Sequence, residues 1–180
     1  MKHIKEKIKD KKGMLSIEYM ISLLIFLTLL TFTVDLAILS VKRNQMTKFS
    51  QTVVRHIRTQ SGLMWETPTN FPGTDDTYLT SSEAANAFRQ QLVNLGLPTS
   101  DAVMILEGTN IHGAQRTYEI KPGQEASANL KYQTPFKLTL KFKYHWGLFS
   151  SFMTDNEGTL TISTSGYTEY NQNADVWEGD

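Results

Sequence analysis

The chain has 180 residues, the length of one domain or of one domain with an extended element. It contains no cysteine, which excludes a disulfide framework and a thiolate metal site. The formal net charge is zero, but residues 1–13 hold six of the 18 basic residues and two of the 18 acidic ones. The rest of the chain therefore has 12 basic and 16 acidic residues, a net charge of −4, and we expect no nucleic-acid contact.

The first thirteen residues form a lysine-rich leader that ends in Gly13. The next residues read MLSIEY, so that Glu18 stands five residues after the glycine, near the start of an apolar segment. A carboxylate inside a membrane-length segment costs roughly 2.5–3.5 kcal/mol on insertion scales. Such a residue normally has a partner and a role, and Glu18 is therefore a candidate functional residue.

An apolar run follows the leader and covers residues 14–41. Its charge-free part, residues 19–34, would measure about 24 Å as an α-helix, and the whole run about 42 Å. A hydrocarbon core is about 30 Å thick, so the run is long enough to cross it. Glu18 and Asp35 are then expected near opposite interfaces, where snorkelling and water reduce their cost.

The charge distribution predicts the orientation of this segment. Six leader lysines favour a cytoplasmic N-terminus, whereas only Lys42 and Arg43 follow the run and oppose that orientation. A secretory signal peptide would have a shorter apolar core and a small-residue cleavage site, which residues 36–40 do not offer. A buried helix of a soluble protein would be apolar on one stripe only, whereas this segment is apolar all round.

The helix is expected to continue beyond the membrane. Residues 44–61 contain neither proline nor glycine, and their apolar residues recur at helical spacing: Met46, Phe49, Val53 and Ile57. Gly62 is the predicted C-cap, with Pro68 shortly after it. The sequence thus predicts one helix over about residues 15–61, with a membrane half and an amphipathic half.

Residues 65–80 are predicted to be a loop, and Thr80 and Glu83 form a capping box that opens a second helix. Gly96 and Pro98 end that helix, whose apolar face is made by Ala84, Ala85, Phe88, Leu92 and Leu95. Short strands are expected over residues 102–106, 116–121 and 127–133, with a turn at Pro122-Gly123.

Residues 136–146 alternate strictly between large apolar residues and lysine, threonine or histidine. This period of two predicts a strand with one buried face and one wet face in an antiparallel sheet, and the lysines are best interpreted as a solvated face. Residues 155–158 are predicted to be a turn, and Leu160 and Ile162 to begin a second strand paired with the first. The tail, residues 167–180, is either a flexible end or a partner-binding strand, and we favour the flexible end at least beyond Asn171.

Catalytic and metal-binding motifs are absent from the sequence. Its four histidines, His3, His56, His112 and His145, are not at metal-ligand spacing. The sequence has no nucleophile elbow, phosphate-binding glycine loop or HExxH motif. We therefore expect a non-enzymatic protein with no cofactor and no metal.

The leader, Gly13, the four residues after it, Glu18-Tyr19 and the apolar run together resemble the class III signal of type IV pilins and pseudopilins. The glycine–Glu-Tyr spacing is similar to that of the Flp or tight-adherence branch. The resemblance implies that a prepilin peptidase cuts between Gly13 and Met14 and that Met14 is then N-methylated. It also implies that Glu18 and Tyr19 serve in assembly with other pilin or pseudopilin subunits.

The resemblance covers roughly residues 9–61, and the long remainder looks like that of a TadE-like minor pilin or pseudopilin. The chain differs from TadE-like proteins in having Met14 after the glycine and no proline before Pro68. The resemblance implies an α+β, pilin-like fold in which a long N-terminal transmembrane helix continues into a head domain with an antiparallel sheet.

The expected domains are a cleaved cytoplasmic leader (1–13), a transmembrane helix (14–43), an extramembrane half of the helix (44–62) and a head (63–180). The chain would reside in the cell membrane as a single-pass protein with its head outside the cytoplasm, and at the cell surface or in a pilus after assembly. The alternative is an unprocessed, signal-anchored extracellular binding domain. An extracellular enzyme is the least favoured class, because no site supports it.

Overall fold

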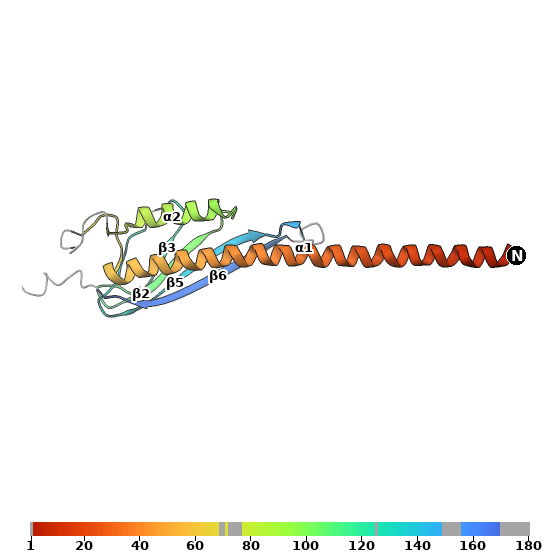
Figure 1. Ribbon diagram of the computed structural model, residues 1–180. Helices are drawn as coiled ribbons and strands as arrows, with labels where there is room; N and C mark the ends of the chain where they lie inside the picture. Colours follow the sequence, from red (N-terminus) through yellow and green to blue (C-terminus); the bar gives the residue numbers. More distant parts are fainter. Residues whose placement is uncertain (1, 69–70, 72–76, 125, 149–155, 170–180) are drawn as a thin grey trace, which may run out of the picture. The chain divides into compact units, whose positions relative to one another are not determined.

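The computed structural model describes residues 2–68, 71, 77–124, 126–148 and 156–169, and side chains from residue 16 onwards. Figure 1 shows the elements, which are α1 (Lys2–Gln60), β1 (Gly62–Leu63), α2 (Ser81–Asn94), β2 (Val103–Thr109), β3 (Gln115–Ile120), β4 (Ala128–Asn129), β5 (Pro135–His145) and β6 (Glu157–Tyr167). The chain divides into two compact units, residues 1–40 with 146–156 and residues 41–145 with 157–180. We call them the first and the second unit. The fold is α+β, with a long apolar N-terminal helix and an antiparallel sheet.

Helix α1 begins at Lys2, well before the expected start near residue 15, so the backbone of the leader is also helical. Lysine, glutamate and isoleucine dominate the leader, and it has no proline, so nothing local breaks the helix. At the other end the helix stops at Gln60, and Ser61, with φ 55°, takes the left-handed conformation. The prediction of Gly62 as the C-cap is therefore wrong.

Gly62 is required for a different reason. It has φ 141° and begins β1, which pairs with β4, so that Gly62 lies opposite Asn129. A Cβ at this position would collide with the carbonyl oxygen of Ala128. The glycine thus permits close strand pairing rather than helix termination. The predicted strand over residues 127–133 is reduced to this two-residue pairing and one bridge between Leu130 and Asn110.

The larger sheet has four strands in the order β3-β2-β5-β6, and all neighbours are antiparallel. Strand β5 is central, as the strict alternation of residues 136–146 predicts, although it ends at His145 and leaves Trp146 outside. Leu138 lies opposite Leu106 on one side and Thr164 on the other, which fixes the register of the buried face.

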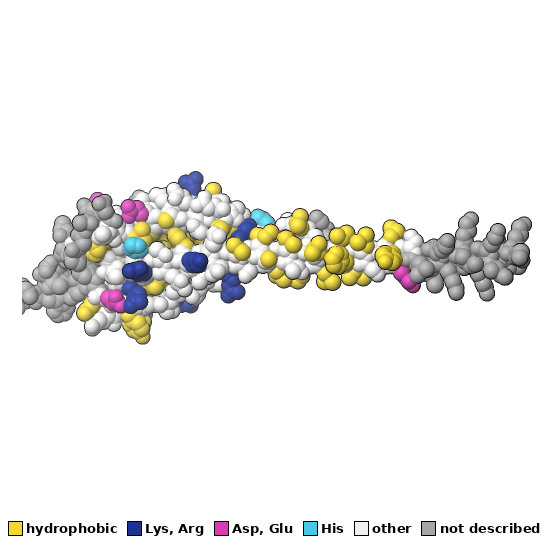
Figure 2. Space-filling model, in the orientation of Figure 1, with side chains coloured by type: hydrophobic (Ala, Val, Ile, Leu, Met, Phe, Trp, Pro, Cys, Tyr) yellow, Lys and Arg dark blue, Asp and Glu magenta, His cyan; other side chains and the backbone are white. Residues whose placement is uncertain are grey.

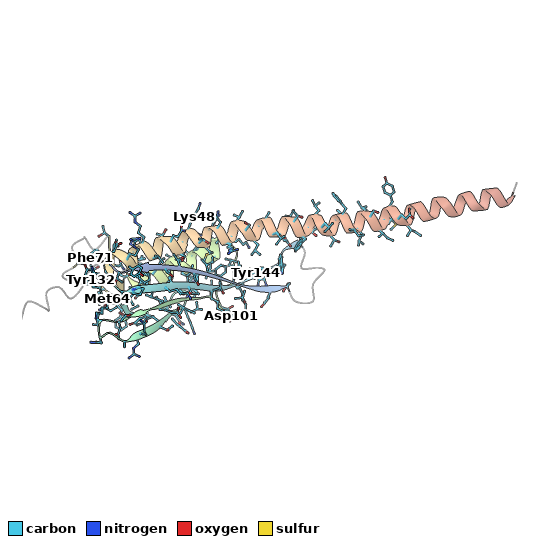
Figure 3. The ribbon with its side chains drawn as sticks, turned by 90° about the horizontal axis from the view of Figure 1, so that it is seen from below. Lys48, Met64, Phe71, Asp101, Tyr132 and Tyr144 are labelled. Carbon is cyan, nitrogen blue, oxygen red and sulfur yellow. The ribbon has the colours of Figure 1, made fainter. Side chains whose placement is uncertain are left out.

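Both helices lie on the same face of this sheet (Figure 3). The core cluster is made by Met46, Val53, Val54 and Ile57 of α1, by Ala84, Ala85, Phe88 and Leu92 of α2, and mainly by Met104, Leu106, Ile120, Phe136, Leu138, Leu140, Phe142 and Ile162 of the sheet. Phe49 of α1 stacks on Phe88 of α2, with ring centroids 5.9 Å apart. The expected apolar faces of both helices are confirmed.

The start of α2 follows the sequence prediction closely. The backbone N–H of Glu83 donates to the Thr80 hydroxyl, and the Glu83 carboxylate accepts from the Thr80 backbone N–H at 2.9 Å. This reciprocal pairing satisfies two of the donors that a helix N-terminus leaves unpaired. The helix ends before Gly96, which has φ 59°.

Strand β6 begins earlier than expected, and the predicted turn at residues 155–158 is wrong for its last two residues. Glu157 and Gly158 pair with His145 and Tyr144 of β5 and so belong to the strand. A Cβ on Gly158 would collide with the ring of Tyr144, which lies across the strand. Glycine in this position gives room to an aromatic ring on the neighbouring strand. In the sequence, such a glycine cannot be told from one that a turn requires.

The wet face of the sheet carries charge pairs. The Nζ atom of Lys143 lies 2.9 Å from Asp101 and 3.3 Å from Glu157, and Lys137 lies 3.7 Å from Glu107. The hydrogen bond to Asp101, followed by that to Glu157, raises the pKa of the Lys143 ammonium above its ordinary value of 10.5. These exposed carboxylates balance much of the lysine charge, which supports the interpretation of a solvated face.

The chain beyond β6 is held as far as Glu169. The buried Thr168 bonds the backbone of Thr134 and Lys131, and the N–H of Glu169 donates to the carbonyl of Arg58 at 2.7 Å. The side chains of Glu169 and Arg58 also form an ion pair. The prediction for the tail beyond Asn171 concerns residues outside the described part of the chain.

The assigned buried face is testable at two neighbouring residues. Phe142 is fully buried and Lys141 points to the wet face, so we expect Phe142→Ala to lower the free energy of unfolding by roughly 3–5 kcal/mol. Lys141→Ala should change it by less than about 0.5 kcal/mol. Thermal unfolding of the full chain in detergent, followed by near-UV circular dichroism, measures the difference. Equal melting temperatures would mean that the two faces are exchanged.

Candidate functional site in the N-terminal helix

Helix α1 presents an apolar surface all round over residues 17–41. Figure 2 shows hydrophobic side chains along this part of the helix, and their exposure reaches 81% at Tyr19 and 60% at Phe26. This is a helix long and apolar enough to cross a membrane, and it lies near the N-terminus, where a membrane anchor or a signal sequence would also lie. So many exposed apolar side chains require a surrounding other than water.

Three threonine hydroxyls within this surface are satisfied by the helix itself. The hydroxyls of Thr28, Thr31 and Thr33 donate to backbone carbonyls of the preceding turn at 2.8–2.9 Å. In an apolar surrounding each unsatisfied hydroxyl would be costly, so these bonds lower the cost of placing threonine there. The three threonines are therefore compatible with an apolar environment.

The residues expected to be functional lie together at the N-terminal end of this surface. Gly13 and Met14 belong to the backbone of α1, and their side chains lie outside the described set. Glu18 and Tyr19 are exposed, and Glu18 makes no hydrogen bond or ion pair with the side chains that are described. Because Met14 and Glu18 are four residues apart, the helix puts them on the same face, one turn from each other.

Asp35, the second acid of the apolar run, has a different environment. Its side chain is buried, with 4% exposure, although its neighbours Val34 and Leu36 are 39% and 42% exposed. Its Oδ1 atom accepts a hydrogen bond from the backbone N–H of Leu148 at 3.1 Å. Asp35 therefore has a partner within its own chain, in the loop that follows β5.

Two further contacts hold this loop against the helix within the first unit. The rings of Phe32 and Trp146 lie 6.1 Å apart between centroids, one helical turn before Asp35. Gly147 packs so closely that a Cβ would lie 2.9 Å from Asp35 Oδ1. Residues 146–148, which we call the Asp35 loop, thus give the carboxylate a backbone donor and pack an aromatic ring on Phe32.

This cluster is not predicted from the sequence, which suggests that Asp35 reaches water at an interface and that Trp146 belongs to the apolar face of the strand. In the structure Asp35 instead accepts a bond from Leu148, and Trp146 packs on Phe32 one helical turn before it. The available signal is the series Trp146-Gly147-Leu148, in which a glycine between two large apolar residues follows directly after the strand. Nothing in the local pattern identifies Asp35 as its partner.

The second unit carries a groove beside the later part of α1. A groove of about 450 Å³ lies between α1 and β6, lined among others by Arg55, Arg58, Thr164 and Glu169, but Arg58 and Glu169 are paired with each other. Among the residues whose side chains are described, no three of His, Cys, Asp or Glu are grouped so as to hold a metal ion.

Comparisons with protein-family models, with curated proteins and with solved structures give no match to this chain.

The Asp35 contact predicts a difference between two variants. Asp35→Ala removes the acceptor of the Leu148 N–H and should release the loop, so that chymotrypsin cuts after Trp146 or Leu148 several-fold faster than in the wild type. Asp35→Asn keeps an oxygen in the same place and should remain close to the wild type. Mass spectrometry of timed digests in detergent locates and quantifies the cuts. Equal protection in both variants would contradict a holding role for Asp35.

Proposed function

We propose that this chain is a non-enzymatic pilin-like subunit, stored in the membrane as a single-pass precursor and processed by a prepilin peptidase. The processed chain then assembles into a type IV, Flp- or Tad-like pilus or pseudopilus as a minor subunit. The observation that carries the proposal is the exposed, largely apolar part of α1 with Glu18 at its N-terminal end, five residues after Gly13. The α+β fold is compatible with this layout.

The apolar surface of α1 suits two successive environments. In the precursor, lipid covers the exposed side chains of residues 17–41. In an assembly, the same side chains would pack against the helices of neighbouring subunits, because a helix that is apolar all round needs cover on every side. A subunit that leaves the membrane without such partners would expose this surface to water and aggregate.

Processing needs a local change in the helix. Gly13 and Met14 are helical in the precursor, and a peptidase acts on an extended backbone. Glycine inside a helix is less stable than alanine by roughly 0.5–1 kcal/mol, so Gly13 is a point where the helix unwinds cheaply. The absence of a side chain also allows the protease to approach the backbone closely.

Glu18 would then serve in assembly. Cleavage creates an α-amino group on Met14 with an ordinary pKa of about 7.7–8.0, which is largely positive at neutral pH. In an apolar bundle a lone ammonium and a lone carboxylate are both costly, and each relieves the other. A pair between Glu18 of one subunit and Met14 of the next would therefore select one axial register, with Tyr19 beside it.

The alternative function is an extracellular binding domain on an uncleaved anchor. The continuation of α1 through Gly13 to Lys2 favours it, because an intact helix is not a protease substrate. The two functions differ in whether the leader is removed, which makes processing the decisive observation.

We expect mass spectrometry of the protein, purified from membranes of cells with a working prepilin peptidase, to find residues 14–180 with N-methylated Met14. Gly13→Leu should leave the leader in place, because a bulky side chain blocks the close approach of the protease. Cells without the peptidase provide the matched control. An intact residue 1 in the wild-type protein from peptidase-positive cells would exclude the pilin-like function and leave the anchored binding domain.

The charge of Glu18 is tested by Glu18→Ala and Glu18→Gln. Both should still insert into the membrane, since each removes a charge, but incorporation into sheared surface filaments should fall at least about tenfold. This expectation follows because removing one partner of a buried charge pair costs roughly 3–5 kcal/mol. Glu119→Gln, an exposed glutamate on β3, is the matched control and should assemble normally. Normal incorporation of both Glu18 variants would remove the assembly role.

A further inference from the structure

We propose that the Asp35 loop is a membrane contact, in which Trp146 and Leu148 enter the outer interface of the bilayer that α1 crosses. The partner is the lipid surface itself, at the level where headgroups meet acyl chains. The inference rests on one part of the proposed function, the crossing of the membrane by α1, and it does not require cleavage or assembly.

The position of Asp35 along α1 sets the level of the loop. The charge-free stretch before Asp35 covers residues 19–34, about 24 Å of helix, and Glu18 closes its other end. A hydrocarbon core of about 30 Å that is centred on this stretch places Asp35 near its outer boundary. The hydrogen bond to Leu148 and the ring contact of Trp146 with Phe32 keep the loop at this same level.

The composition of the loop matches that place. Tryptophan concentrates at membrane interfaces, because its large ring is apolar and its N–H is a donor. Leu148 is 58% exposed, and the helix surface on both sides of Asp35 is apolar and exposed, at Val34, Leu36 and Ile38. The side chains of the loop are therefore continuous with the apolar surface of α1, and lipid that covers one reaches the other.

The loop also explains how a carboxylate is tolerated at this depth. A charge near the hydrocarbon boundary requires water or a donor. Asp35 is almost fully buried, the Leu148 backbone N–H supplies a donor, and Gly147 packs closely against Oδ1. The loop thus shields Asp35, and it leaves Leu148 exposed and the ring of Trp146 half-buried at the height of the interface.

The test measures the depth of Trp146 in phosphatidylcholine vesicles that contain the full chain at a low protein-to-lipid ratio. Trp65→Phe with Trp177→Phe leaves Trp146 as the only tryptophan. Lipids brominated near the headgroup end of the acyl chain should quench its fluorescence about twofold more than lipids brominated near the methyl end. As the reference, Phe26→Trp in a chain whose three natural tryptophans are phenylalanine should show the opposite order, since residue 26 lies in the middle of the run.

The outcomes separate the inference from the proposed function. If the Phe26→Trp reference is quenched and Trp146 is not, α1 crosses the membrane and the loop contact is wrong. If neither is quenched, the membrane crossing itself fails. Trp146 emission that changes with protein concentration but not with lipid bromination would assign the surface to a second copy and overturn the inference.

Gly147→Ala tests how the loop is held. The added Cβ would meet Asp35 Oδ1 at 2.9 Å and should displace the loop, so that shallow quenching of Trp146 falls markedly. Leu148→Ser leaves the backbone donor in place and should weaken quenching less. Unchanged quenching in Gly147→Ala would contradict positioning of the loop by Asp35.

Discussion

The exclusion of water from the apolar surface of α1 is the constraint on which the N-terminal part of this protein depends. Residues 17–41 expose large hydrophobic side chains on every side of the helix. The threonine hydroxyls within this surface bond the helix backbone, and the one buried acid is covered by the Asp35 loop. These threonines and Asp35 are thus satisfied by the chain itself, which lowers the cost of placing them in an apolar surrounding.

The same helix obeys a different rule after residue 41, where it belongs to the second unit. Only one face is buried there, made by Met46, Val53 and Ile57, and the intervening positions include exposed arginines. Before this point the sequence is continuously hydrophobic, which gives an apolar surface all round the helix. After it, apolar residues recur every three or four positions, which gives a single apolar stripe. This change marks where the helix stops being apolar all round and begins to pack on the sheet with one face.

The elements that the sequence predicts well are those whose cause is local. The capping box of Thr80 and Glu83 needs only four consecutive residues, and the alternation along β5 is a property of that strand alone. The turn at Gly123, with φ 74°, is closed by a local hydrogen bond from the Gln124 N–H to the Lys121 carbonyl. In each case the physical requirement and the sequence signal occupy the same short segment.

The predictions that are wrong concern residues whose partners lie far away in the chain. Gly62 looks like a helix cap but allows Ala128 to approach, and Gly158 looks like a turn but makes room for Tyr144. Trp146 continues the alternation of β5 in sequence, yet its ring contacts Phe32. Glycine and aromatic residues are used both in local turns and strands and in contacts with distant residues. The residue type alone therefore does not show which of the two it serves.

The two acids of the apolar run show how a candidate site follows from such contacts. Asp35 has its partner in its own chain, so nothing further is needed to explain why a carboxylate is tolerated there. Glu18 is exposed and has no partner among the described side chains, although it stands at the edge of an equally apolar surface. At a membrane interface water is sufficient for it, but in a bundle of such helices water is excluded. In the proposed assembly, the free N-terminus of a neighbouring subunit would provide the donor. Asp35 thus has an intramolecular donor, whereas the proposed donor of Glu18 is intermolecular.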